Sequence, residues 1–229
     1  MVGSKVDYDI NDLYIPKDGK EDIDYQKSFN AFLTIIVRDK DGKIIKKYKQ
    51  KSHSPTANFI GIMLPTTYYN EVQQCWTITT TSNSTFSYGY NCNWTVYPSN
   101  QSNYPSYIQN IIVGSGTQSN PYSAYNLASP IANGSGTGQL LYSSLNIPTG
   151  ITINGSQAYF IISQSYANQS GGTITISEVG IILNLYVAII NLTSFGNGSV
   201  LMWYDVLSSP ISVGNGQSVI IYYTFSVNA

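Results

Sequence analysis

The sequence contains unusually little charge. Lys, Arg, Asp and Glu make up 10% of its 229 residues, against about 25% in an average soluble domain. The deficit is local, because residues 1–51 carry both signs of charge and no Lys or Arg follows Lys51. The acids and the single histidine beyond that point are His53, Glu71, Glu178 and Asp205. Hydrophobic content is an ordinary 42%, so the missing charge does not indicate a disordered chain.

The shortage of titratable side chains argues against an enzyme, which normally brings several of them together. His53 and Asp205 are the partners available for a serine relay, but the Gly-x-Ser-x-Gly elbow is absent and His53 follows a basic stretch. A pair of acids from Glu71, Glu178 and Asp205 is equally weak as a glycosidase site. Glu178 and Asp205 adjoin strand-like residues, where we expect them to accept backbone hydrogen bonds or fix a strand end. We predict no catalysis, no metal and no cofactor.

Targeting signals are also lacking. The N-terminal stretch is polar and charged, without the apolar region of a secretory signal. The longest apolar run, residues 179–192, is too short to cross a bilayer and is typical of a buried strand. We therefore expect synthesis in the cytoplasm without Sec-type export.

Cysteine is rare. Cys75 and Cys92 flank a stretch that reads as a strand, a polar loop and a return strand. A disulfide closing this loop would stabilise the fold by about 3 kcal/mol. Two reduced cysteines in a β-rich core fit the sequence equally well, and the spacing is not that of a zinc site.

Abundant Tyr, Thr, Ser, Asn and Gly favour strands and tight turns. We predict an all-β, jelly-roll-like β-sandwich with an extended N-terminal arm (residues 1–28), a hairpin (29–37 and 43–49) and one short helix near 54–64, capped by Ser54 with Pro55 at its first position. The remaining strands are expected at 75–80, 86–97, 106–114, 139–146, 157–166, 172–184, 185–193, 199–206 and 217–227. The domains are a charged arm and hairpin, 1–51, and a low-charge body, 52–229; one continuous domain from about residue 29 is the alternative.

Eight Asn-x-Ser/Thr sequons lie in the low-charge region, which suggests a glycosylated exterior. The candidates are Asn83, Asn93, Asn100, Asn133, Asn154, Asn168 and Asn197. Asn191 lies within an apolar run and suits a glycan least. The competing interpretation is that Asn and Ser serve only as turn formers.

The charge distribution suggests an acidic, hot environment. At about pH 2–3 carboxylates are largely neutral while Lys stays cationic, so an ordinary surface becomes strongly positive. A surface of hydroxyls, amides and Tyr keeps the same charge at either pH. The lysines of 43–51 also suggest nucleic-acid phosphates, but the carboxylates interspersed in residues 7–41 argue against a strong site of that kind.

Four stretches resemble structural proteins of viruses that infect hot-spring archaea. They are "RDKDGKIIKKYKQKSHSPTANFI" (38–60), "IIVGSGTQSNPYSAYNLASPI" (111–131), "ANQSGGTITISEVGIIL" (167–183) and "LMWYDVLSSPISVGNGQSVIIYYTFSV" (201–227). The second block is also similar to a segment of some phage tail-associated proteins. This chain departs from the pattern at Tyr125 and Asn126, where the family often has Asp.

The resemblance implies a jelly-roll virion protein that forms a cyclic homo-oligomer at a specialised vertex, such as a turret, a penton or a tail nozzle. It implies exposure at the particle surface, contacts with other virion proteins, proximity to a viral membrane, and contact with host surface glycans. Glu178 and Asp205 would be architectural. The docking residues would be Arg38, Lys43, Lys46, Lys47, Lys49 and Lys51.

Two other classes stay open. One is a surface-filament subunit of the host that exchanges a donor strand. The other is a glycan-binding module of a tail fibre, which would stack sugar rings on Trp76, Trp94 or the aromatic residues of 97–107.

Overall fold

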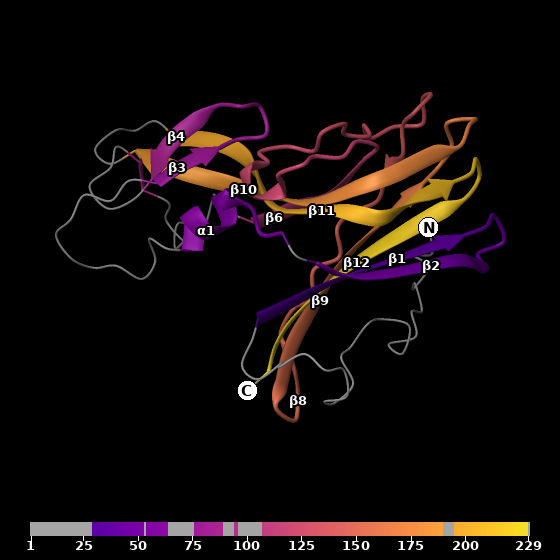
Figure 1. The fold of residues 1–229 in the computed structure, drawn as a ribbon, viewed down its shortest axis with the longest axis horizontal. Coiled ribbons are helices and arrows are strands. Elements are labelled where there is room, and N and C mark those ends of the chain that lie inside the picture. The colour runs from indigo at the N-terminus through magenta and orange to yellow at the C-terminus, as the bar shows by residue number, and fades with distance from the viewer. Residues whose placement is uncertain are drawn as a thin grey trace. The chain divides into compact units, whose positions relative to one another are not determined.

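The computed structural model describes residues 29–52, 54–63, 76–88, 94–95, 107–189 and 195–228. In these ranges the chain forms two antiparallel sheets, a two-stranded ribbon and a short α-helix, α1 (Ala57–Met63) (Figure 1). The predicted all-β fold with one short helix is confirmed, and its two sheets are consistent with a β-sandwich. The jelly-roll arrangement remains a prediction, and the predicted arm, residues 1–28, lies outside the described residues.

The chain divides into two compact units that are interleaved in sequence. The first comprises Met1–Ser52, Tyr142–Ala167 and Gly216–Ala229, and the second comprises His53–Leu141 and Asn168–Asn215. The predicted division into 1–51 and 52–229 has its boundary close to Ser52. It does not include the two later segments, Tyr142–Ala167 and Gly216–Ala229, in which the chain returns to the first unit. These returns arise because strands from the middle and the end of the chain complete the sheet that the N-terminal hairpin begins.

The first sheet has the strand order β2 (Ile44–Ser52), β1 (Phe29–Arg38), β12 (Ser218–Asn228), β9 (Gln157–Ala167), β7 (Leu141–Tyr142), with β8 (Thr152–Asn154) also paired to β9. The central strand β1 is buried on both faces between Asn30 and Val37. Leu33 lies opposite Tyr223 of β12 and Gln50 of β2, which fixes the register across three strands. On the other face, Ile36, Ile220 and Tyr222 form a buried cluster.

The hairpin between β1 and β2 follows from its turn residues. Asp39 accepts hydrogen bonds at Oδ1 from the backbone N–H groups of Asp41 and Lys43, at 3.0 and 2.9 Å. Gly42 has a φ of 82°, which a residue without a side chain adopts readily. Arg38 closes the turn by donating from its guanidinium to the Gly42 carbonyl at 2.8 Å.

The second sheet is built around two long strands, β10 (Ile174–Ile189) and β11 (Phe195–Val213). β10 also pairs with β5 (Trp94–Thr95) and β6 (Tyr107–Gly114). The prediction of separate strands at 172–184 and 185–193 was wrong, because β10 runs through Asn184, which pairs with Ser199. The pairing of β10 with β11 shifts register between Ile176 and Glu178 and again between Ile181 and Ile182, as at β-bulges, and then continues along both strands.

The ribbon and the helix complete the second unit. β3 (Trp76–Thr79) pairs with β4 (Thr85–Tyr88), and a single 3-10 turn, η3, spans Pro121–Ser123. Helix α1 begins later than predicted, because Pro55 bridges to Trp203 and Ser54 accepts the Tyr204 N–H at 3.0 Å. Asn58 ties the helix to β3 through a donated and an accepted backbone hydrogen bond with Thr79, at 2.8 and 3.0 Å.

Candidate functional site

The most elaborate polar site in the described structure surrounds Glu178. This residue lies in β10, in register with Gly114 of β6 and Val206 of β11, and its exposed fraction is 0%. Its Oε1 accepts hydrogen bonds from the backbone N–H groups of Ser129 at 2.7 Å and Gly116 at 3.1 Å. Its Oε2 accepts from the Tyr204 hydroxyl at 2.6 Å and the Ala128 N–H at 2.9 Å. Four donors therefore compensate for the loss of water around the carboxylate.

The carboxylate anchors the loop that follows β6. Residues 128–131 run back beside the end of β6, where Ser115 donates its N–H to the Ser129 carbonyl and Ile131 donates to Val113. Gly114 and Gly116 permit this close approach. A Cβ on Gly114 would lie 2.3 Å from Oε1 of Glu178 and 2.7 Å from the Ser129 carbonyl oxygen. Glu178 thus connects the 115–131 loop to strand β10 of the sheet.

Among the described residues, Tyr204 provides the only side-chain donor to this carboxylate. Burial raises the pKa of the Tyr204 hydroxyl well above its ordinary value, and the hydrogen bond and negative charge of Glu178 raise it further. The ring packs with Ala124, Leu127 and Leu201 in a buried cluster. Both oxygens of this buried carboxylate accept hydrogen bonds from the loop or from Tyr204, an arrangement that connects the loop to the sheet.

The second predicted architectural acid, Asp205, is also buried. It lies in β11 opposite Val179, with an exposed fraction of 2%. The other titratable candidates from the sequence, His53 and Glu71, lie outside the described residues. Within the described ranges, no three His, Cys, Asp or Glu side chains are grouped so that they could hold a metal ion.

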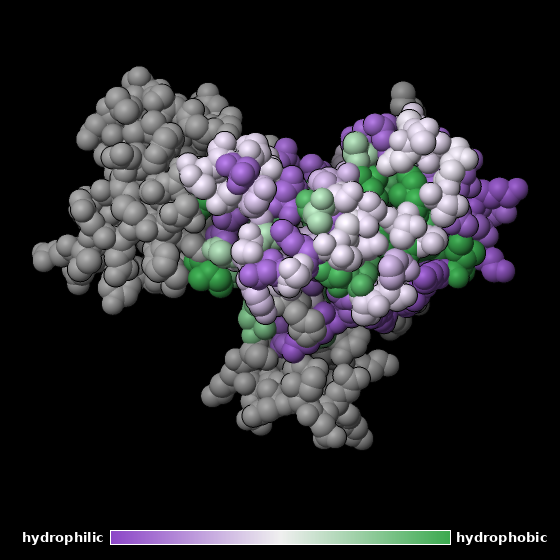
Figure 2. Space-filling model, turned by 45° about the horizontal axis from the view of Figure 1, so that its top comes forward, coloured by the Kyte–Doolittle hydropathy of each residue, from purple (hydrophilic) through white to green (hydrophobic). Residues whose placement is uncertain are grey.

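Burial of the two acids leaves the described surface beyond the hairpin without formal charge. Glu178 and Asp205 are the only acids in the described ranges that follow Lys51, and both are buried. All other described charged residues lie between Arg38 and Lys51. In Figure 2 much of the described surface on one face is pale, the colour of near-neutral hydropathy.

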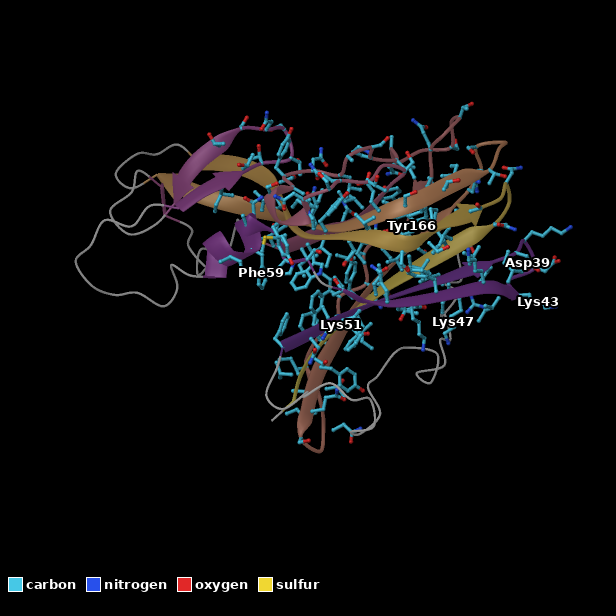
Figure 3. All side chains as sticks on the ribbon, in the orientation of Figure 1. Asp39, Lys43, Lys47, Lys51, Phe59 and Tyr166 are labelled. Atoms are coloured by element: carbon cyan, nitrogen blue, oxygen red, sulfur yellow. The ribbon has the colours of Figure 1, made fainter. Side chains whose placement is uncertain are left out.

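The side chains of the predicted docking residues do not all lie on one face of the sheet. In an antiparallel sheet, side chains of directly opposite residues lie on the same face. Lys47, Lys49 and Lys51 of β2 lie opposite Ile36, Thr34 and Phe32 of β1 and so share one face, which we call the lysine face. Lys46 lies opposite Val37 and faces the other way. Arg38 and Lys43 lie at the tip of the hairpin, where both contact turn residues. Figure 3 labels Lys43 at this tip.

The candidate glycosylation sites differ in accessibility. Asn83, Asn133 and Asn154 are exposed, and Asn83 occupies the turn between β3 and β4 with a φ of 62°. Asn197 lies in β11. Asn93 and Asn100 lie outside the described residues, as do Cys75, Cys92 and the 97–106 part of the aromatic loop. Trp76 and Trp94 lie in β3 and β5.

Asn168 differs from Asn83, Asn133 and Asn154 because it is fully buried. Its Nδ2 donates to the carbonyls of Gly172 at 2.8 Å and Val213 at 2.7 Å. Its Oδ1 accepts from the N–H and the hydroxyl of Ser170 at 3.0 and 2.8 Å. A glycan on this nitrogen would replace one of its two hydrogens, remove one of the two donated hydrogen bonds and need space at a fully buried position, so we expect Asn168 to serve as a structural side chain in the folded protein.

Sequence reasoning missed Tyr204 and the structural role of Asn168. Tyr204 is one of 20 tyrosines, and its position beside Asp205 gives no sign that it faces Glu178. The Asn168 motif, Asn-Gln-Ser-Gly-Gly, carried a usable signal: Asn side chains commonly bond their own backbone two residues on when glycines follow.

Comparison of the chain with protein-family models, with curated proteins and with solved structures finds no match. No helix among the described residues is long and apolar enough to span a membrane.

Proposed function

We propose that this chain is a non-enzymatic structural protein of a virus particle. It forms a cyclic homo-oligomer at a specialised vertex or tail end, in the manner of a turret or nozzle, and its uncharged body faces a hot acidic medium. One observation carries this proposal: described surface charge is confined to the Arg38–Lys51 hairpin, while the later acids are buried. The resemblance of the four sequence blocks to virion proteins supplies the class of particle.

The physical advantage of such a surface appears on acidification. A protein with ordinary surface carboxylates loses their negative charge below about pH 4 and gains a large net positive charge that opposes compact assembly. Residues 54–63, 76–88 and 107–228, where described, have no exposed acid to neutralise and no cation to leave unbalanced. Their mutual contacts should therefore be the same in acid as at neutral pH.

An uncharged exterior also favours self-association, because charged residues are depleted in the cores of protein interfaces. One exposed apolar row crosses the end of the first sheet. Phe29, Val227 and Ile153 are 53, 45 and 76% exposed, and the register aligns Phe29 with Val227, Val227 with Ala158 and Ala158 with Ile153. An exposed row of this kind is typical of an interaction surface.

The assembly is tested by light scattering and electron microscopy of the full-length protein, comparing wild type with Ile153→Ser and with Thr152→Ser. The two positions are adjacent and exposed on β8, but only Ile153 belongs to the apolar row. Closed rings that Ile153→Ser weakens and Thr152→Ser preserves would support the proposal. A monomeric wild type across micromolar concentrations would refute it.

The location is tested by mass spectrometry of purified particles that contain this chain. The proposal expects few copies relative to the main capsid protein, as a vertex or tail component requires. A copy number equal to that of a major shell protein would exclude a specialised vertex.

A further inference from the structure

Two tyrosines are exposed on the 115–131 loop, which Glu178 connects to β10. Tyr122 and Tyr125 are 58 and 36% exposed. Neither side chain makes a hydrogen bond or an aromatic ring contact among the described residues. A tyrosine combines a large apolar ring with a hydroxyl that both donates and accepts hydrogen bonds. Two uncommitted tyrosines on one loop therefore offer a contact surface to a partner.

The backbone that carries these two rings is fixed by packing. Ala124 and Leu127 alternate with the tyrosines along the chain, and both are buried against Leu201 and Tyr204. The Ala124 N–H also closes a tight turn by donating to the Pro121 carbonyl at 3.2 Å. Because the loop is already ordered, a partner that binds the rings does not have to order the backbone first.

Hydrogen bonds hold the loop on the C-terminal side of the tyrosines. Asn126 donates from Nδ2 to the Thr81 carbonyl at 3.1 Å, and its Oδ1 accepts the Leu127 N–H at 2.8 Å. Two residues further on, the Ser129 N–H donates to Glu178 at 2.7 Å. The loop is therefore attached to the ribbon through Thr81 and to the second sheet through Glu178.

The side chains beside the tyrosines are polar and uncharged. Thr117, Ser119 and Asn120 are exposed, and their side chains make no hydrogen bond with the described residues. Residues 115–131 contain no charged residue, and the charged residues in the described part of the second unit, Glu178 and Asp205, are buried. Since this surface offers no charge to complement an ionic partner, it fits a neutral one.

The size of the surface favours a small partner over a protein. A stable protein interface buries about 800 Å² on each side and draws on about 20–30 residues around an apolar core. The large apolar groups that this loop exposes are only the two tyrosine rings. A sugar presents a face of C–H groups with hydroxyls around its rim, which matches an aromatic ring beside hydroxyl and amide side chains.

We propose that the 115–131 loop binds a neutral saccharide. Its sugar rings stack on Tyr122 and Tyr125. Its hydroxyls exchange hydrogen bonds with Thr117, Ser119 and Asn120. The contact lies within one copy of the chain, so it does not depend on the proposed oligomer.

Saturation-transfer difference NMR of the full-length protein tests this contact. The probes are hexasaccharides of α-glucose, β-glucose, α-mannose and N-acetylglucosamine, with a sulfated hexasaccharide as the charged control. We expect transfer from the protein to at least one neutral probe, reduced about fivefold in Tyr122→Ala and in Tyr125→Ala. Tyr122→Phe keeps the ring, and Ile151→Ala removes an exposed apolar side chain of the first unit. Both should change the transfer by less than about twofold.

Absence of transfer to all four neutral probes overturns the proposal, as does transfer that both alanine variants retain. Transfer to the sulfated probe alone also overturns it, because it would show ionic recognition. Light scattering of the same samples separates this proposal from ring formation. Lost transfer at unchanged oligomer mass supports a saccharide on the loop, whereas a lower mass in Tyr122→Ala would show that the loop contacts a second copy instead.

Discussion

Replacement of Glu178 by Gln gives the sharpest test of the buried anchor. The substitution keeps the shape of the side chain but converts one carboxylate oxygen into an NH₂ donor. If this nitrogen takes the place of Oε1, it meets the N–H groups of Gly116 and Ser129. If it takes the place of Oε2, the Ala128 N–H loses its acceptor, and the Tyr204 hydroxyl can accept from the new NH₂ group only by giving up the hydrogen bond that it donated to Oε2.

The expected loss of stability follows from the second orientation of the amide, which leaves fewer backbone N–H groups without an acceptor. One buried backbone N–H is left without an acceptor, which costs about 1–3 kcal/mol, and the remaining bonds lose their charge assistance. We therefore expect Glu178→Gln to lower the free energy of unfolding by about 2–4 kcal/mol. Equilibrium unfolding in urea measures this change, provided the slope with denaturant stays constant.

The matched control is Asp41→Asn, which makes the same chemical change at an exposed turn residue. It should alter stability by less than about 0.5 kcal/mol. Amide hydrogen exchange should also accelerate in residues 115–131 of Glu178→Gln, because this loop loses its anchor. A Glu178→Gln protein as stable as the control would show that the four hydrogen bonds to Glu178 do not stabilise the fold.

Three further predictions concern the same two units. Gly114→Ala should destabilise by about 1–3 kcal/mol in urea, since its Cβ would lie 2.3 Å from Oε1 of Glu178; Gly150→Ala, with no atom within 4 Å, should not. The raised pKa of Tyr204 means that the stability contributed by its neutral hydroxyl is complete below about pH 10 and is lost as pH rises towards the folded-state pKa. Tyr204→Phe should therefore flatten the alkaline fall of unfolding free energy, and an unchanged slope would count against this assignment. In a glycosylating host, peptide mapping should find glycan at Asn154 and none at Asn168, and modified Asn168 in folded protein would contradict its buried network.

The sequence indicated the elements that local chemistry determines. The turn residues around Gly42 predicted the first hairpin, and the apolar residues after Pro55 predicted the short helix. The strand break predicted between residues 184 and 185 was wrong, because β10 runs through Asn184 without interruption. In the structure its pairing with Ser199 continues the ladder, and such a partner is not visible in the local sequence.

The candidate site was less accessible to sequence reasoning, because it depends on contacts between distant residues. Scarcity of charge pointed to Glu178 and Asp205 as architectural acids. The donors to Glu178 come from residues 49, 50 and 62 positions away in sequence, and from Tyr204. Burial of both acids, which leaves the described surface beyond the hairpin uncharged, likewise required the fold.

Multi-angle light scattering of the full-length protein at pH 7 and at pH 3 measures whether the proposed oligomer survives acid. We expect one closed oligomer of the same mass at both pH values, because the uncharged surfaces that form it do not titrate. A monomer at both values, or dissociation and unfolding on transfer to pH 3, would contradict it.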